Sequence, residues 1–195
     1  MKSPIVYYAG FVVLIFVLGL SGQWVNPWLS WNRYGLNDFE LWRLITGHMV
    51  HTNLWHTFIN LSVLSAAMLL FGRLYKPQEW ILIFLLLCVC DSMGLYLLSP
   101  WLANYVGLSG VIYGILAIGF LKNFYQNPLL NSAVLIFITG KIIWEQMPGF
   151  DVDYLRTQIK AAVIVDAHLY GFISGICFYL GTMVWNKYNV GKPGK

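Results

Sequence analysis

Long apolar segments separated by short polar breaks fill most of the chain. A scan for about 17 to 25 apolar residues between polar breaks identifies candidate membrane spans. The six candidates are Ile5–Gly22, Leu54–Phe71, Trp80–Leu98, Ser109–Lys122, Leu129–Trp144 and Ala162–Trp185. No linker, low-complexity tract or internal repeat separates them, which indicates one domain over residues 1–195. The pattern therefore predicts an all-α membrane protein whose six transmembrane helices form a bundle.

Composition supports this class and excludes several others. The 195 residues are 58% hydrophobic and 10% charged, whereas a soluble domain has about 25% charged residues. All three cysteines lie inside apolar segments, where a thiol usually packs as a small hydrophobe, so a disulfide-stapled secreted domain is excluded. The first segment could also be a signal peptide, but no A-x-A-like cleavage site follows it. We expect an uncleaved first helix.

Charges orient the predicted bundle, because six spans place both ends of the chain on one side. That side has a net charge of +6, from Lys2, Arg73, Lys76, Lys122, Lys187, Lys192 and Lys195 against Glu79. The opposite side is neutral, with Arg33, Arg43, Lys141, Arg156 and Lys160 against Asp38, Glu40, Glu145, Asp151 and Asp153. Basic loops favour the cytoplasm, so we predict cytoplasmic termini. The formal net charge of +4 reflects this difference between the two sides of the membrane and not a basic patch. We therefore expect no nucleic-acid partner.

A long outer loop, Gln23–Asn53, follows the first span and is rich in tryptophan, with Trp24, Trp28, Trp31 and Trp42. Tryptophan prefers the headgroup level of a bilayer. Two interpretations stay open, an aromatic belt lying in the interface and a dedicated functional loop.

Polar groups inside membrane spans are costly and usually face the interior of a bundle, which makes them candidates for a functional site. His56 and Asn60 are four residues apart and share a helix face. Gly107-Leu108-Ser109-Gly110 with Tyr113 begins the fourth span, and His168 lies near the start of the sixth. All three clusters fall in the outer half of the predicted membrane.

The fourth span is too short to cross the bilayer. Ser109–Lys122 spans about 20 Å at 1.5 Å per residue, against a hydrocarbon core of about 30 Å. Its N-terminus therefore starts inside the membrane, with Ser109 at that end. Free backbone N–H groups and the helix dipole suit this position to stabilising an oxyanion.

A serine hydroxyl needs a base to become a nucleophile, and His168 has the right chemistry. Gly110 and Gly114, with Ala167, Gly171 and Gly175 on the sixth span, form small-residue faces that let two helices approach closely. We expect this approach to join Ser109 and His168, and Tyr113 to stack on the imidazole. Taken singly, Ser109 could be a packing residue and His168 a core histidine; their conjunction favours a catalytic site.

At these residues the sequence resembles the rhomboid intramembrane serine proteases. The resembling elements are Trp42-Arg43, His51, His56-Thr57-Phe58-Ile59-Asn60, Gly107-Leu108-Ser109-Gly110 with Tyr113, and Ala167-His168 with Gly171 and Gly175. The resemblance implies Ser109 as nucleophile and His168 as general base, without a third carboxylate. It also implies an oxyanion hole formed by His56, Asn60 and the Ser109 backbone N–H, and a structural role for Trp42 and Arg43.

Within the family, the small size and the run His48-Met49-Val50-His51-Thr52-Asn53 are most similar to rhombosortases. That similarity implies substrates in the bacterial inner membrane that carry a Gly-Gly motif, a transmembrane helix and a basic cytoplasmic tail, cut at the periplasmic side. An ordinary rhomboid protease of single-pass substrates is the alternative. Hydrolysis and transpeptidase-like transfer to an amine both stay open. Membrane lipid is the other expected partner, and no cofactor is expected.

Two other classes of protein are weighed against this interpretation. A metal or haem protein could use His48, His51, His56 and His168, yet the chain lacks an H-E-x-x-H pattern. An inactive client-binding relative has no need of the Ser109 constellation. We assign no catalytic role to Asp91 or Asp166, and we expect Lys141, Arg156 and Lys160 to lie in a solvated outer loop turning at Pro148-Gly149.

Overall fold

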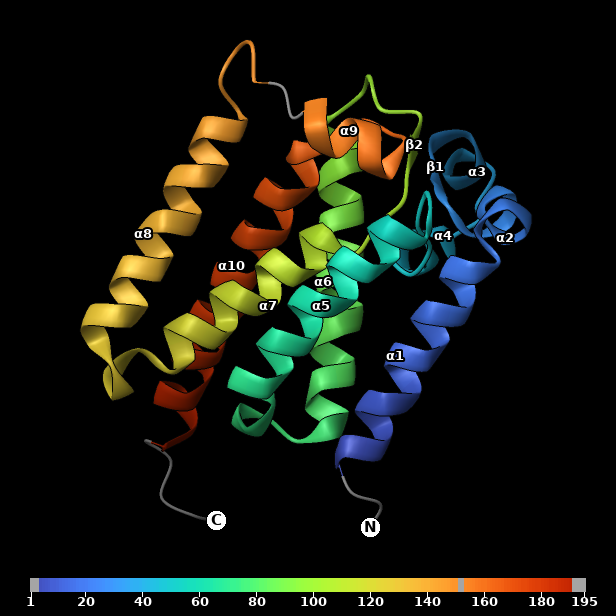
Figure 1. Ribbon diagram of the computed structural model, residues 1–195. Coiled ribbons are helices and arrows are strands. Elements are labelled where there is room, and N and C mark those ends of the chain that lie inside the picture. The colour runs from blue at the N-terminus through green and yellow to red at the C-terminus, as the bar shows by residue number, and fades with distance from the viewer. Residues whose placement is uncertain (1–3, 151–152, 191–195) are drawn as a thin grey trace.

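The computed structural model describes residues 4–150 and 153–190, and its long helices follow the apolar segments of the sequence (Figure 1). These helices are α1 (Pro4–Leu20), α5 (Leu54–Phe71), α6 (Pro77–Leu98), α7 (Ser109–Lys122), α8 (Pro128–Glu145) and α10 (Val165–Val190). The shorter elements are α2 (Gly22–Leu29), β1 (Trp31–Asn32), α3 (Arg33–Asn37), α4 (Arg43–Thr46), η1 (Gly72–Leu74), β2 (Asn104–Tyr105), η2 (Phe124–Gln126) and α9 (Asp153–Ile159). Lys2, Asp151, Lys192 and Lys195, which enter the charge count, lie outside the described residues.

Helix ends in the structure have local chemical causes. Asn53 and Asn127 cap α5 and α8 by accepting a backbone N–H three residues later. Proline occupies the first turn of α6 and of α8, where its missing N–H costs no intrahelical hydrogen bond. The predicted bounds of the second and fourth segments agree with α5 and α7, and the other bounds differ by a few residues.

Four helices in the described part of the chain are long and apolar enough to cross a membrane. They cover Leu54–Leu74, Pro77–Leu98, Pro128–Glu145 and Val165–Tyr188. Tyr7–Leu20 and Ser109–Lys122 are apolar but shorter. The prediction of a helical, multi-pass membrane protein is therefore confirmed, whereas the count of six spans stays a prediction. The start of α1 and the end of α10 lie at the same end of the bundle (Figure 1).

Helix α7 lies at the centre and packs most closely on α10 (Figure 1). Small residues make this contact possible, as predicted. A Cβ atom added to Gly114 would lie 2.8 Å from the carbonyl oxygen of Gly171, and one added to Gly175 would lie 2.8 Å from the Cα of Gly114. Such distances are shorter than real Cβ contacts. The two backbones therefore touch directly, and this glycine seam sets the distance between the first turns of α7 and α10.

The long segment between α1 and α5 is folded rather than a simple interfacial loop. Its side chains divide: Trp31 is fully buried, while Trp24 and Trp28 are more than 70% exposed. Burial thus separates the tryptophans of this segment, and both interpretations of it stay open. The strand β1 pairs antiparallel with β2, with Trp31 opposite Tyr105, so the segment is tied directly to the chain that leads into α7.

Trp42 and Arg43 hold this segment together. The Arg43 guanidinium is buried, pairs with Glu40, and donates to the carbonyls of Ser30 (2.8 Å) and Pro27 (3.1 Å). The Trp42 indole donates to the carbonyl of Trp28 (3.1 Å). These contacts agree with the structural role that the resemblance implies for both residues.

Arg33 is a second organising cation of the same segment. The charge count treated it as an ordinary outer charge, but its guanidinium donates to four carbonyl oxygens at and beyond the end of α6, those of Leu95, Tyr96, Ser99 and Leu102. Carbonyls in the last turn of a helix lack intrahelical partners. Arg33 therefore supplies the donors that the end of α6 needs and fixes it to α3.

Candidate active site

Ser109 is the first residue of α7, and the chain before it is held on both sides. Gly107 has a φ of 130°, a backbone conformation that favours glycine. Its carbonyl accepts from the Tyr105 hydroxyl (2.7 Å), and its N–H donates to the carbonyl of Gly47 (3.1 Å). The start of α7 is therefore fixed by one contact within its own segment and one with the separate segment that contains Gly47.

The structure brings Ser109 and His168 together as predicted. Ser109 Oγ lies 3.0 Å from His168 Nε2, across the glycine seam between α7 and α10. His168 is 6% exposed. The Tyr113 ring packs on the imidazole with ring centroids 4.6 Å apart and an interplanar angle of 33°. A serine hydroxyl, an imidazole and an aromatic ring thus meet at one buried place.

A carboxylate that sequence reasoning missed lies on the far side of the imidazole. Glu145, the last residue of α8, places Oε2 2.9 Å from His168 Nδ1, and its side chain is 3% exposed. Its other oxygen, Oε1, pairs with Lys141 Nζ. The expectation that Lys141 lies in a solvated outer loop is wrong, because Lys141 belongs to α8; Glu145 entered the sequence analysis only as a charge of the outer side. Their four-residue spacing at the end of an apolar helix, which puts them on one face, was the available signal.

His56 and Asn60 line the space above Gly107. A Cβ atom added to Gly107 would lie 3.0 Å from His56 Nε2 and 3.9 Å from Asn60 Nδ2. Asn60 is 4% exposed, and its Nδ2 has no hydrogen-bond partner within the described part of the chain. A buried amide donor without a partner is costly. The α5 face therefore offers a free donor close to the first residue of α7.

The protonation of His56 follows from its neighbour Thr52. The Thr52 hydroxyl donates its one hydrogen to the carbonyl of Ile159 (2.6 Å), so it accepts a bond from His56 Nδ1 (3.1 Å). A neutral His56 then presents an unprotonated Nε2 to the Gly107 side. Only the doubly protonated ring donates there.

Comparison with known proteins places this geometry in a family. Residues 38–185 match the Rhomboid domain, which covers all of the residues named in this candidate site. The chain belongs to the rhomboid family. It is also 23% identical over 145 residues to the protein of Bacillus subtilis (strain 168) named "Putative rhomboid protease YdcA", an alignment that covers 72% of this chain and 67% of that protein. Rhomboid proteins are intramembrane serine proteases, so the class predicted from the sequence is confirmed at the level of the family.

The two acidic residues that sequence reasoning kept out of catalysis have other neighbours in this rhomboid protein. Asp166 pairs with the Ser99 hydroxyl. Asp91 is fully buried on α6, against Gly110, and 3.8 Å from His48 Nδ1. In the described residues, no group of three or more His, Cys, Asp or Glu side chains could hold a metal ion.

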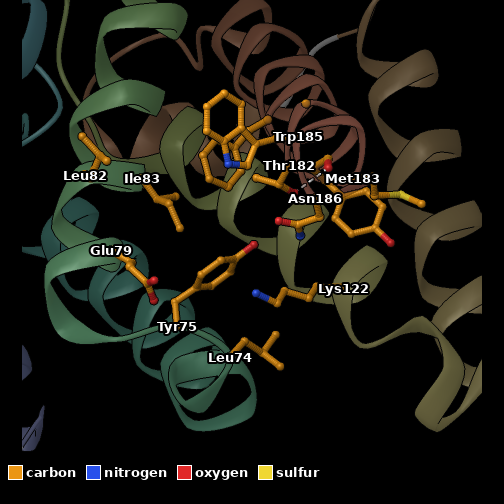
Figure 2. A pocket seen from close by; sticks show the side chains of 13 residues that line it. Leu74, Tyr75, Glu79, Leu82, Ile83, Lys122, Thr182, Met183, Trp185 and Asn186 are labelled. Carbon is orange, nitrogen blue, oxygen red and sulfur yellow. Dashed lines mark hydrogen bonds between the residues drawn. The ribbon is translucent and has the colours of Figure 1, made fainter. Parts of the chain in front are cut away.

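A large groove lies at the other end of the bundle from Ser109. Figure 2 shows it near the ends of α7 and α10, where Lys122 Nζ lies 3.3 Å from the centroid of the Tyr75 ring. Its volume is about 930 Å³, and most of its lining is apolar. Because α7 and α10 each run from the Ser109–His168 contact toward this groove, it is no part of the candidate active site.

Acid is expected to destabilise the rhomboid domain through two histidines between α4 and α5. Burial lowers the pKa of His48 to about 4, and burial together with the neighbouring His56 lowers the pKa of His51 to about 3. Unfolding raises both toward 6.5, so their contribution is present above pH 6.5 and is lost as the pH falls toward the folded-state values. We expect up to about 1.4 kcal/mol per pH unit from each, measured by thermal unfolding in detergent between pH 7.5 and 5.

His51→Leu provides the internal comparison. It removes one of the two titrating groups, so its unfolding temperature is expected to fall less steeply with acid than that of the wild type. An equal pH dependence for both proteins would contradict the assignment to His51.

Proposed function

We propose that this rhomboid protein cleaves transmembrane-anchored substrates with Ser109 as nucleophile and His168 as general base. The observation that carries the proposal is the 3.0 Å contact between Ser109 Oγ and His168 Nε2 at the start of α7. A serine hydroxyl becomes a nucleophile when an adjacent base takes its proton. The Tyr113 ring packs against the imidazole and restrains the base.

The oxyanion of the tetrahedral intermediate is stabilised by donors converging above Gly107. The Ser109 N–H lies in the first turn of α7, where backbone N–H groups have no intrahelical acceptor. Asn60 Nδ2 supplies a buried donor without another partner in the described part of the chain, and His56 lines the same space. Removing one such donor typically lowers the rate by about 10²–10³-fold.

The membrane arrangement follows from the charge pattern and the length of α7. With six spans and cytoplasmic termini, Ser109 lies below the outer surface of a bacterial inner membrane, and the site opens to the periplasm. Water then reaches the acyl-enzyme from that side. Substrates present a helix that must unwind to reach Ser109, which glycine eases by about 1 kcal/mol per residue.

Substrates with a C-terminal Gly-Gly motif, a transmembrane helix and a basic tail are the proposed class, as in rhombosortases. The run from His48 to Asn53 supports this choice. In the structure, His48 is fully buried and bonds Ser92 Oγ (2.9 Å), so the run supports the chain around the site. An ordinary single-pass substrate is the second candidate. Transfer of the acyl group to an amine is the variant reaction.

Labelling of the detergent-solubilised protein by a fluorophosphonate probe tests the nucleophile. We expect one adduct, located on Ser109 by peptide mass spectrometry, and none in Ser109→Ala. An adduct on another serine, or equal labelling of Ser109→Ala, would overturn the assignment.

Cleavage in proteoliposomes tests the substrate class. Two model substrates share one transmembrane helix and basic tail and differ only in carrying Gly-Gly or Leu-Leu before the helix. The proposal predicts faster cleavage of the Gly-Gly substrate, and added glycinamide distinguishes transfer from hydrolysis by the mass of the product. Equal cleavage of both substrates would favour an ordinary rhomboid protease.

A further inference from the structure

We propose that Glu145 is a positioning residue for His168, so that the catalytic unit is Ser109–His168–Glu145 rather than a pair. This inference rests on the proposed function, because it concerns the same site. The three side chains come from three helices, α7, α10 and α8, and form one line of contacts: Ser109 Oγ to His168 Nε2 at 3.0 Å, and His168 Nδ1 to Glu145 Oε2 at 2.9 Å.

The tautomer of His168 follows from this line. A general base must accept the Ser109 proton on Nε2, so the hydrogen of the neutral ring must reside on Nδ1. Nδ1 lies 2.9 Å from a carboxylate oxygen, which accepts that hydrogen. Glu145 therefore selects the reactive tautomer and fixes the plane of the ring, and Tyr113 restrains the same ring from its face.

Lys141 makes a buried carboxylate possible at this position. A carboxylate side chain that is 3% exposed would be strongly disfavoured without a cation. Lys141 lies one turn earlier on α8 and pairs with Oε1, leaving Oε2 for His168. Its side chain is 38% exposed, and its Nζ lies 5.3 Å from the Tyr113 ring centroid. Lys141, Glu145, His168 and Tyr113 thus form a closed ring of contacts.

The carboxylate acts in each proton transfer without being protonated itself. The Ser109 O–H bond breaks as its oxygen bonds to the substrate carbonyl carbon; the proton passes to His168 Nε2, and the carbonyl electron pair moves to oxygen. His168 is then an imidazolium whose charge faces Glu145. When the carbon–nitrogen bond of the substrate breaks, the same proton leaves with the amine. A water molecule then attacks the acyl-enzyme through the same proton transfers and releases the acyl group.

A purely structural role makes a different prediction. If Glu145 only fastened α8 to α10, its loss would reduce the number of correctly folded molecules but not the rate at which each one reacts. The fraction of molecules labelled by fluorophosphonate at saturation reports the first quantity, and the rate constant of labelling reports the second. Measuring both separates the two roles.

The experiment compares the wild type with Glu145→Gln, Glu145→Asp and Lys141→Met, with Glu79→Gln as the matched control. Glu79 caps α6 and lines the remote groove. We expect Glu145→Gln to label to the same fraction but about 10²–10⁴-fold more slowly. Glu145→Asp keeps the charge one methylene farther away, and its labelling rate is expected to be at least about tenfold higher than that of Glu145→Gln. The rate of Lys141→Met is expected to lie between those of Glu145→Gln and the wild type. The rate of Glu79→Gln is expected to equal that of the wild type.

The pH profile of the labelling rate gives a second readout, because Glu145→Gln removes the negative charge that stabilises the imidazolium. The acidic limb of the labelling rate is expected to move to lower pH in Glu145→Gln. The groups that face His168 or lie close behind it are Tyr113 from α7, Lys141 and Glu145 from α8, His56 from α5, and Asp91 from α6 behind Gly110. Only Glu145 changes in this comparison.

Failure of this inference is distinguishable from failure of the proposed function. If the wild type labels on Ser109 and Glu145→Gln reacts at the wild-type rate, or only its labelled fraction falls, the positioning role is overturned and the Ser109–His168 pair stands. If the wild type does not label on Ser109, the proposed function fails first. Should Glu145→Gln not fold, Glu145→Ala decides: a wild-type rate constant in that variant also overturns the inference.

Discussion

Replacement of His168 by alanine is expected to lower the rate of Ser109 labelling and of substrate cleavage by about 10³-fold or more. The imidazole is the group within hydrogen-bond distance of Ser109 Oγ that can take its proton at neutral pH. Alanine leaves the hydroxyl in place but protonated. Rate constants for labelling and for cleavage in proteoliposomes measure the effect.

Ser109→Ala and the double variant complete this comparison. Residues that act as one unit are not additive, so the double variant is expected to be no slower than either single variant. Unchanged unfolding temperatures would show that the loss is chemical. Cleavage by His168→Ala at a rate within tenfold of the wild type would contradict the role of general base.

Gly171→Ala is expected to be the most disruptive single-methyl substitution in the bundle. The new Cβ would overlap the backbone of Gly110, and its distance to Gly110 Cα would be 3.0 Å. Backbone cannot move aside as a flexible side chain can, so α7 and α10 must separate. Overpacking of this kind costs about 1–3 kcal/mol, and the separation also lengthens the contact between Ser109 and His168. We expect both a lower unfolding temperature and a strong loss of labelling.

Gly181→Ala is the matched control on the same helix. A Cβ at Gly181 meets no atom within 4 Å, so the substitution adds helix propensity without strain and is worth up to about 1 kcal/mol in favour of the fold. Its labelling rate is expected to equal that of the wild type. Similar losses of unfolding temperature and labelling rate in both variants would contradict the direct backbone contact between α7 and α10.

Much of the fold was predictable because the membrane imposes simple rules on the sequence. Apolar length alone located the long helices, and the spacing of Gly110, Gly114, Gly171 and Gly175 correctly predicted which pair packs most closely. These signals are local or periodic along the chain. They need no knowledge of which loop contacts which.

The segment between α1 and α5 was less predictable because its order comes from long-range contacts. Trp31 is buried by pairing with Tyr105, more than 70 residues away, and Arg33 binds carbonyls beyond the end of α6. Composition treated all the tryptophans alike, as an interfacial belt or as parts of a functional loop. Only the fold separates Trp31 from Trp24 and Trp28.

The candidate site shows the same division. Ser109 and His168 were found because each breaks an apolar segment at a similar depth, and the structure places them in contact. Glu145 was missed because it lies at the end of α8, where charges are ordinary and usually solvated. Its proximity to His168 depends on how α8 leans on α10, which no local pattern encodes.

The spread of the site along the chain has a consequence for biogenesis. His56 and Asn60 enter the membrane early during synthesis, Ser109 later, and His168 only with the last described helix. Until α10 has been inserted and has closed the glycine seam against α7, a partly made chain holds a serine without its base. If Ser109 and His168 act as proposed, the protein is inert while it is being translated beside other nascent membrane proteins, and it becomes active only when α10 is in place.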